Sequence, residues 1–278
     1  MVLPCLVACA HRAEPVQRSA LETPAGDSPA PSATARPRPD PVVLTAVSVV
    51  PPPHPLDPLS NSDLDRLLTI APAELGCASL GQPNRGALFN GVQASDNELW
   101  EVVHPERTWA TPETLSGLRR AVEAVHREFP GTPRLHLGDM SNRRGGHQRP
   151  HRSHQSGRDA DIAYYYLAEQ RWYQKVTEDN LDRPRTWALV RALLADPDVE
   201  YIFVDIFVQN LLKDYALSLG EDPMWLDEMF GGLARRTPAP IRHTWGHRTH
   251  LHVRFRALEA CRTGERLYPL LRARRLYR

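Results

Sequence analysis

The chain has 278 residues, of which 41% are hydrophobic and 24% are charged, as in an ordinary soluble protein. Its 34 basic and 33 acidic residues leave a formal net charge of +1, which excludes a general electrostatic attraction to nucleic acid or to a membrane surface. Beyond the N-terminus, no segment has the roughly 18 consecutive apolar residues that a membrane-spanning helix needs, so we expect none.

The N-terminus has some features of an export signal. An apolar run covers residues 3–10, and it ends in a sequence similar to a lipoprotein signal box, Leu6-Val7-Ala8-Cys9. In such boxes the cysteine becomes the acylated first residue of the mature protein. The basic residues that usually precede the run are absent and the run is short, so a cleaved signal of another kind, or none, stays open. We predict a signal segment over residues 1–10, with a lipid anchor at Cys9 as its most specific form.

A proline-rich linker is predicted over residues 11–60. Twelve of the 26 prolines lie between residues 10 and 60, where helical and strand periodicity are both weak. This composition favours extended backbone and is typical of a disordered tether between an anchor and a folded domain. The apolar stretch at 42–50 is the exception, because it could dock as a strand.

The remainder, residues 61–278, is predicted to be a single α+β domain with a mainly antiparallel sheet flanked by helices. Its clearest helix begins at Thr111, a capping residue followed by Pro112 at the first helical position, and it stops at Pro130-Gly131. Between these ends, apolar residues recur at helical spacing: Leu115, Leu118, Val122, Val125 and Phe129. The later pattern predicts strands at 135–137 and 161–167, a helix at 184–195, a strand at 199–208, a helix ending at 220, and a strand at 250–255.

The four cysteines are Cys5, Cys9, Cys77 and Cys261, and no two of them form a C-x-x-C pair. This spacing excludes a zinc site of four thiolates. Cys77 and Cys261 lie near the two ends of the predicted domain, so an oxidising compartment favours a disulfide between them. The alternative is two buried free thiols.

Seven of the twelve histidines lie in two short windows, with His147, His151 and His154 in the first and His243, His247, His250 and His252 in the second. In a strand, His250 and His252 would share one face, while Leu251 and Val253 would point from the other face into a core. Two imidazoles at this spacing could both bind one metal ion. Alternatively, one could bind the metal while the other reaches the metal-bound water, and the spacing alone does not choose.

The first window supplies His154 and, seven positions later, Asp161, with a turn-like segment between them. A histidine before a turn and an aspartate that opens a strand can converge on one point. Two histidines and a carboxylate are a usual zinc ligand set with an open position for water, so we predict a metal site here. Asp159 is a rival ligand or supports one, and we interpret His147 and His243 as ordinary surface residues.

The motifs around these residues resemble those of the penicillin-insensitive murein endopeptidase family. The first motif is Gly138-Asp139-Met140-Ser141, then Gly145-Gly146, then residues 151–162, and the second covers residues 246–254. At a wider level they are similar to the lysostaphin, D-Ala-D-Ala peptidase and hedgehog superfamily, with its H-x6-D and H-x-H signatures. The resemblance spans about residues 75–262. Members of the family carry more cysteines in the catalytic domain, which puts the disulfide pattern in doubt but not the metal site.

The resemblance implies that residues 61–278 are a zinc peptidase domain in which Zn2+ is held by His154, Asp161 and His252. It implies His250 as the general base, His247 as a further catalytic histidine and His151 as a substrate-binding residue. The implied substrate is peptidoglycan, cut at the D-alanyl to meso-diaminopimelyl cross-link. Penicillin would not inhibit the reaction, because there is no serine nucleophile to acylate. The implied location is the periplasm or cell envelope.

Two alternatives stay open. A D,D- or L,D-carboxypeptidase that trims stem peptides would need a cationic group for the terminal carboxylate, which could come from Arg143, Arg144, Arg158 or Arg248. A non-catalytic zinc-binding or wall-binding module is the second alternative. Both histidines of the H-x-H signature are present, which argues against that module.

Overall fold

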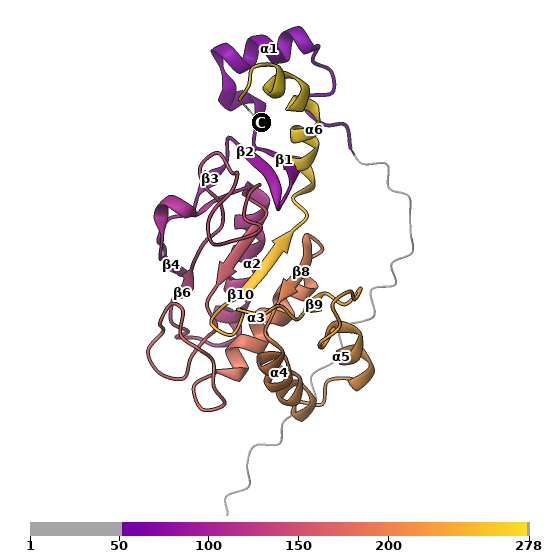
Figure 1. Cartoon of the computed structure of the whole chain (residues 1–278). Coiled ribbons are helices and arrows are strands. Elements are labelled where there is room, and N and C mark those ends of the chain that lie inside the picture. The colour runs from indigo at the N-terminus through magenta and orange to yellow at the C-terminus, as the bar shows by residue number, and fades with distance from the viewer. Residues whose placement is uncertain (1–51, 277–278) are drawn as a thin grey trace, which may run out of the picture. The chain divides into compact units, whose positions relative to one another are not determined.

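The computed structural model describes residues 52–276 (Figure 1). The predicted signal segment, Cys9, the linker up to residue 51 and the apolar stretch at 42–50 therefore lie outside the described residues. No helix within residues 52–276 is long and apolar enough to cross a membrane.

The described part contains six α-helices and ten strands. The helices are α1 (Asn61–Ile70), α2 (Pro112–Glu128), α3 (Arg183–Ala195), α4 (Ile206–Ser218), α5 (Pro223–Met229) and α6 (Leu258–Ala273). The strands are β1 (Ala78–Gln82), β2 (Arg85–Phe89), β3 (Val92–Gln93), β4 (Trp100–Val102), β5 (Trp109–Ala110), β6 (Leu135–Leu137), β7 (Asp159–Ile162), β8 (Val199–Phe203), β9 (Ile241–Arg242) and β10 (Leu251–Phe255). Two short 3-10 helices complete the set, η1 (Pro72–Leu75) and η2 (Pro105–Arg107).

The central sheet has six strands in the order β4-β6-β7-β10-β8-β9. Its three inner pairs, β6 with β7, β7 with β10 and β10 with β8, are antiparallel. The two outer pairs, β4 with β6 and β8 with β9, are parallel. The prediction of an α+β fold with a mainly antiparallel sheet is confirmed.

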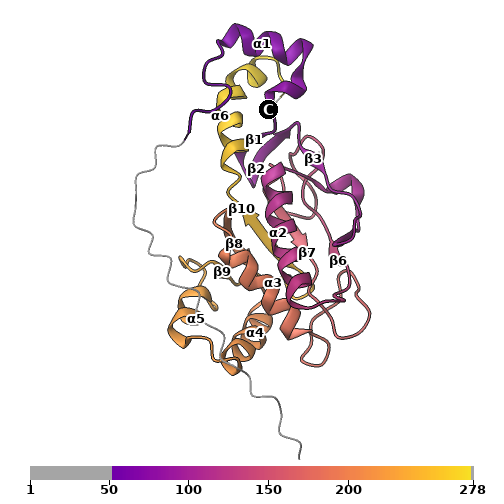
Figure 2. The same cartoon turned by 180° about the vertical axis from the view of Figure 1, so that it is seen from behind.

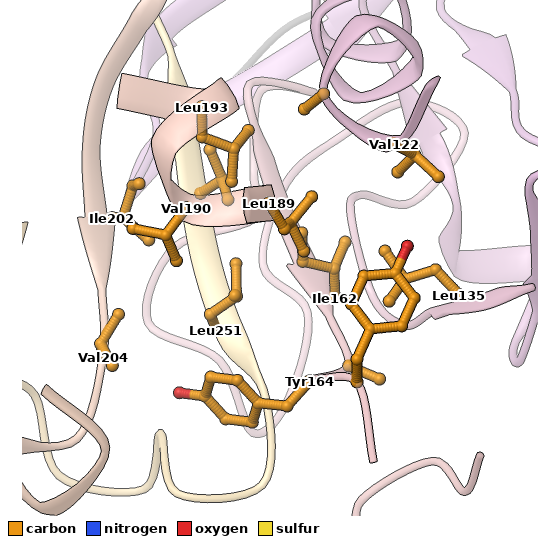
Figure 3. Packing of buried hydrophobic residues seen from close by; sticks show 14 of the residues in the cluster. Val122, Leu135, Ile162, Tyr164, Leu189, Val190, Leu193, Ile202, Val204 and Leu251 are labelled. Carbon is orange, nitrogen blue, oxygen red and sulfur yellow. The ribbon is translucent and has the colours of Figure 1, made fainter. Parts of the chain in front are cut away.

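Helices α2 and α3 cover one face of this sheet and form the main core with it. In Figure 3, Val122 from α2 and Leu189 from α3 lie over Leu135, Ile162 and Leu251 from three neighbouring strands. All five side chains have an exposed fraction of 0%. Because side chains alternate along a strand, the residues between these core positions point to the opposite face of the sheet.

The local signals for the helices have the effects expected from the sequence. The Thr111 side chain accepts a hydrogen bond from the backbone N–H of Thr114, with Pro112 at the first helical position of α2. Asp182 and Asp205 cap α3 and α4 in the same way. Thus the predicted helices at 111–130 and 184–195 are confirmed.

Two strand predictions were too long. The strand predicted at 161–167 begins two residues earlier, at Asp159, and ends at Ile162. The next residue, Ala163, still donates to the carbonyl of His136, but the backbone N–H of Tyr165 instead donates to the Thr186 hydroxyl of α3. The strand predicted at 199–208 ends at Phe203, because Asp205 caps a helix.

A second, smaller core joins α1, α6 and the β1–β2 hairpin, which lie together in both views (Figures 1 and 2). It consists of eight buried residues: Leu56, Leu64, Leu68, Leu75, Ala78, Leu80, Leu267 and Leu271. Leu56 precedes residue 61, where we placed the start of the domain. His54 is also buried, and its Nε2 lies 3.0 Å from the Thr263 hydroxyl of α6. The packed part of the chain therefore begins within the predicted linker.

Cys77 and Cys261 are free thiols, so the disulfide predicted between them is not formed. Burial raises the pKa of the Cys77 thiol to about 12. It also raises the pKa of Cys261. Both side chains are therefore protonated at neutral pH, as in the alternative of two free thiols.

Candidate metal centre and active site

The pairing of β7 with β10 brings the two histidine windows together. His252 lies directly opposite Asp161, and Arg254 lies directly opposite Asp159. These four side chains point away from α2 and α3, since the alternate residues of both strands face the core. The sequence predicted this alternation along residues 250–255, but not which residue of β7 would face which residue of β10.

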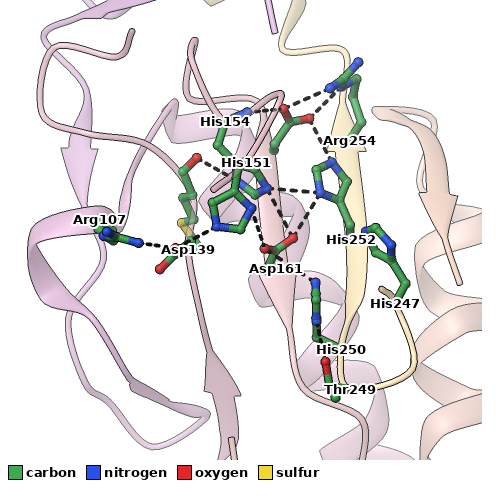
Figure 4. A network of polar contacts seen from close by, with 12 residues as sticks. Arg107, Asp139, His151, His154, Asp161, His247, Thr249, His250, His252 and Arg254 are labelled. Carbon is green, nitrogen blue, oxygen red and sulfur yellow. Dashed lines mark hydrogen bonds and ion pairs between the residues drawn. The ribbon is translucent and has the colours of Figure 1, made fainter. Parts of the chain in front are cut away.

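Three donor atoms form a small triangle on this face of the sheet (Figure 4). Nε2 of His154 lies 3.1 Å from Nδ1 of His252 and 3.3 Å from Oδ1 of Asp161. Nδ1 of His252 lies 3.0 Å from the same carboxylate oxygen. The exposed fractions of the three side chains are 1%, 2% and 3% for His154, Asp161 and His252. We call these three residues the ligand triangle.

Neighbouring groups orient the rings of His154 and His252 so that one nitrogen of each ring faces the centre of the ligand triangle. Nδ1 of His154 donates to the backbone carbonyl of Met140 at 2.8 Å, which leaves Nε2 as the lone-pair nitrogen of the neutral ring. Nε2 of His252 lies 3.2 Å from Oδ1 of Asp159, so its Nδ1 faces the triangle. Metal-binding histidines usually have such a partner on the second nitrogen, because it fixes the tautomer and the ring orientation.

Asp159 supports both histidines of the ligand triangle. Besides facing His252, its carboxylate accepts a hydrogen bond at 2.9 Å from the backbone N–H of His154. This bond helps to hold His154 in a left-handed backbone conformation, with φ of 64°, which is unusual for a residue other than glycine. Arg254 donates two hydrogen bonds to the same carboxylate, at 2.6 and 2.9 Å. These contacts are the ones expected for a supporting residue, one of the two roles that the sequence left open for Asp159.

The charges of the centre favour a cation between these groups. Burial raises the pKa of Asp161, but His154, His252 and His250 outweigh this effect and hold it well below its usual value. Burial lowers the pKa of His252, yet Asp159 and Asp161 raise it to about 9. The His252 ring between the two carboxylates is therefore protonated at neutral pH, and binding a metal through its Nδ1 would release that proton.

His250 and His247 lie beside the ligand triangle. Nε2 of His250 is 3.6 Å from Oδ2 of Asp161, and its Nδ1 is 2.9 Å from the Thr249 hydroxyl. The ring centroid of His247 lies 5.0 Å from that of His250 and 5.9 Å from that of His252. Burial lowers the pKa of both His250 and His247, to about 3 in the case of His247, so both rings are neutral at pH 7.

His151 links the centre to a second carboxylate. Its Nδ1 lies 3.6 Å from Oδ2 of Asp161, and its Nε2 lies 2.8 Å from Oδ2 of Asp139. Arg107 and His104 also contact Asp139, each at 2.9 Å. Burial raises the pKa of Asp139, but the hydrogen bonds from His151, Arg107 and His104 hold it well below its usual value. Together with His154 and Asp161, His151 forms a group whose potential ligand atoms lie within 4.8 Å of one another.

The six residues predicted for the site are thus brought together, whereas several supporting residues were missed. Asp139 was part of the first motif, directly after a predicted strand, but it had been given no role. His104 and Arg107 flank or belong to the short helix η2 and follow no periodic pattern that could have identified them. The backbone carbonyl of Met140 has no signal in the sequence at all.

Other residues considered from the sequence lie outside the centre. His147 is exposed, whereas Nδ1 of His243 accepts a hydrogen bond from the backbone N–H of Ile206 at the start of α4. Of the arginines considered for a terminal carboxylate, Arg143 lies over the ring of Trp109 and Arg248 over that of Phe207.

Similar proteins bear the same name as the family recognised in the sequence. The penicillin-insensitive murein endopeptidase of Yersinia enterocolitica is 30% identical over 190 residues, which cover 62% of each chain. That of Pectobacterium atrosepticum is 28% identical over 199 residues, 64% of each chain, and that of Klebsiella pneumoniae 29% over 167 residues, 54% of each. The chain thus spans less than two thirds of the length of these relatives.

The sequence profile of the family matches residues 79–267, which include every residue of the ligand triangle and both flanking histidines. The match begins in β1, ends in α6 and covers more than half of the chain. The chain belongs to the penicillin-insensitive murein endopeptidase family.

Proposed function

We propose that the protein is a zinc-dependent endopeptidase that hydrolyses D-alanyl to meso-diaminopimelyl cross-links in peptidoglycan. The observation that carries the proposal is the ligand triangle, with two neutral histidines next to it. Family membership supports the substrate class, because the relatives are named for cleavage of murein. A lipid anchor at Cys9 and a location in the periplasm or cell envelope belong to the same proposal.

The donor set of the ligand triangle fits zinc. Zinc takes histidine nitrogens and carboxylate oxygens at about 2.0–2.2 Å, so neighbouring ligands of a tetrahedral site lie roughly 3.3 Å apart. The three distances within the triangle, 3.0, 3.1 and 3.3 Å, agree with that spacing. Three protein ligands leave a fourth position open, as in catalytic zinc sites. Zinc held there would act as a Lewis acid and make water nucleophilic at neutral pH.

His250 is the residue best placed to move a proton. Its buried ring is neutral at pH 7, and its Nε2 points toward Asp161, so it can accept a proton from the attacking water. The protonated ring can then return the proton to the amine that leaves when the peptide bond breaks. Asp161 next to it stabilises the protonated form.

His247 has a different role from His250 in this proposal. Its Nδ1 lies 3.2 Å from the backbone carbonyl oxygens of Thr244 and Trp245, to which it can donate its only proton. Nε2 of the neutral ring then accepts hydrogen bonds. As a further catalytic histidine, His247 would therefore accept a hydrogen bond from an N–H group of the substrate and orient it next to His250.

The proposal is tested with purified full chain, cross-linked muropeptide dimers and chromatography. Dimers should be converted to monomers by the zinc-loaded protein, should persist in the presence of a chelator, and should again be cleaved when zinc is returned. Free pentapeptides form the second arm, since a carboxypeptidase would release their terminal D-alanine. Intact dimers with the zinc-loaded protein would contradict the proposal, and trimmed pentapeptides would favour the carboxypeptidase.

A further inference from the structure

Two aromatic side chains cover His250 from a loop that has no role in the function proposed above. The ring of Tyr173 stacks on the ring of His250, with centroids 5.5 Å apart and 20° between the planes. The ring of Trp172 lies 5.9 Å from both of these rings. Tyr173 is nevertheless 61% exposed, so part of its ring covers His250 while the rest faces solvent. We call Trp172 and Tyr173 the aromatic wall.

The loop that carries the aromatic wall is fixed at both ends. The backbone N–H of Val176 donates to the carbonyl of Arg248 at 2.9 Å, and the Arg248 side chain donates back to the Val176 carbonyl at 3.0 Å. Before the wall, the Gln170 side chain forms hydrogen bonds with both the N–H and the carbonyl of Tyr166. The wall is therefore attached to the segment after β7 and to the loop that leads into His250.

Trp172 is tightly packed, whereas the backbone of Tyr173 is strained. Trp172 packs so closely on Gly138 that a Cβ at position 138 would lie 2.0 Å from its ring. Tyr173 has a left-handed backbone, with φ of 63°, which is strained for a bulky side chain. Glycine would suit this backbone better. Because an exposed and strained aromatic residue does not stabilise a loop, its position on His250 points to contact with a ligand.

We propose that Tyr173 binds the substrate through the apolar atoms of the residues that flank the scissile peptide bond, and that Trp172 holds Tyr173 in place. This inference rests on the function proposed above. Because Tyr173 stacks on His250, a peptide bond that reacts at His250 lies close to the Tyr173 ring. The parts of a cross-link nearest to that ring are then the alanyl methyl group and the diaminopimelyl methylenes. Such groups pack well on an aromatic face. The contact is made by the ring of Tyr173 and does not need its hydroxyl.

The test compares steady-state kinetics of the zinc-loaded full chain with those of Tyr173→Ala, on cross-linked peptide dimers without sugars. The variant should raise KM roughly 5- to 30-fold, as expected for an aromatic side chain at a binding hot spot, with little change in kcat. Tyr173→Phe should keep KM within about twofold of the wild type, because the ring is retained. Tyr268→Ala, which removes a partly exposed tyrosine from α6, is the matched control and should not change KM.

Tyr173→Gly separates binding from a structural role. Glycine relieves the left-handed backbone, so the thermal midpoint should not fall, whereas KM should rise as in Tyr173→Ala. A lower midpoint with unchanged KM would mean that the ring only supports the loop. A loss confined to kcat, or an effect seen only with dimers that carry sugars, would also overturn the proposal.

Failure of the proposed function gives a different result. In that case the zinc-loaded wild type leaves the dimers intact, and binding of the dimers to the chelator-treated protein is measured by calorimetry. Tyr173→Ala should weaken this binding by the same roughly 5- to 30-fold. An unchanged affinity, or no binding to the wild type, overturns the role of the aromatic wall.

Discussion

His154 and His250 are both buried imidazoles that face Asp161, but their second ring nitrogens have different partners. Nδ1 of His154 donates to a backbone carbonyl, whereas Nδ1 of His250 faces the Thr249 hydroxyl. Only Nε2 of His154 belongs to the ligand triangle. His154→Ala should therefore lose zinc and activity together, because two ligands hold the metal much less tightly than three. His250→Ala should lose activity and keep most of its zinc, as measured by metal analysis after dialysis.

The matched comparison is the zinc content of the two variants at equal folded fraction, checked by circular dichroism. If His250→Ala also lost the metal, His250 would be a ligand rather than the base. If His154→Ala retained the wild-type amount, the ligand triangle would not be the metal site.

Asp139 gives a prediction about pH, since its pKa is held well below the usual value by His151, Arg107 and His104 despite burial. A carboxyl with a lowered folded pKa stabilises the fold fully above its unfolded pKa of about 3.9 and loses this contribution as the pH falls further. Asp139→Asn should therefore cost about 1–3 kcal/mol at pH 7 and less at pH 3.

Urea denaturation of the wild type and of Asp139→Asn, both with chelator, measures this difference. Subtracting the two curves removes the contribution of the acidic groups that do not interact with Asp139. A gap in unfolding free energy that is the same at pH 3 and pH 7 would mean that the carboxylate charge of Asp139 does not stabilise the fold.

At the scale of the elements, α2 packs against β10 at a glycine. A Cβ at Gly117 would lie 2.3 Å from the ring of Phe255, which is fully buried and cannot move aside. Alanine is favoured over glycine in a helix by about 0.5–1 kcal/mol, but overpacking a core costs about 1–3 kcal/mol. Gly117→Ala should thus destabilise the protein by about 1–2 kcal/mol.

The neighbouring Ser116 is exposed and provides the control for this change. Ser116→Ala gains helix propensity without a clash, so it should alter the unfolding free energy by less than about 0.5 kcal/mol. Chemical denaturation of both variants gives the comparison. Equal or higher stability of Gly117→Ala would show that the contact between α2 and β10 can relax.

Elements with local signals were predictable from the sequence. The capping residues Thr111 and Pro112 defined the start of α2, and alternation along β10 correctly separated His252 from the core residues. The end of β7 was missed because the buried tyrosines after Ile162 have the composition of a strand, while their backbone bonds to other partners. Apolar composition cannot distinguish the two cases.

The candidate site shows the same division. The sequence grouped His154, Asp161 and His252, because a turn and an alternating strand can bring such residues to one point. Contacts such as those of His104 and Arg107 with Asp139 depend on how distant segments pack, which no local pattern records. The same holds for the aromatic wall, whose stacking on His250 depends on a loop between β7 and α3.

At the scale of the whole molecule, the smaller core extends the fold beyond the sheet that carries the site. The segment before α1 contributes Leu56 to this core, and its His54 contacts Thr263 of α6. Ser60 caps α1 and forms a capping box with Asp63. A protein that starts at residue 61 lacks all of these contacts, so its smaller core should be less stable than that of a protein that starts at residue 52.

The shorter protein should lose about 2–4 kcal/mol of unfolding free energy, because it lacks the buried Leu56 side chain and the Ser60 helix cap. For a domain of this size, such a loss lowers the thermal midpoint by roughly 5–15 °C. Differential scanning calorimetry of the two truncated proteins measures the effect, and Leu56→Ala in the longer one isolates the contribution of the leucine. Equal midpoints for both proteins would mean that residues 52–60 do not stabilise the fold. Zinc content should be the same in both, because the ligand triangle is built on β7, β10 and the loop before β7, all within the larger core.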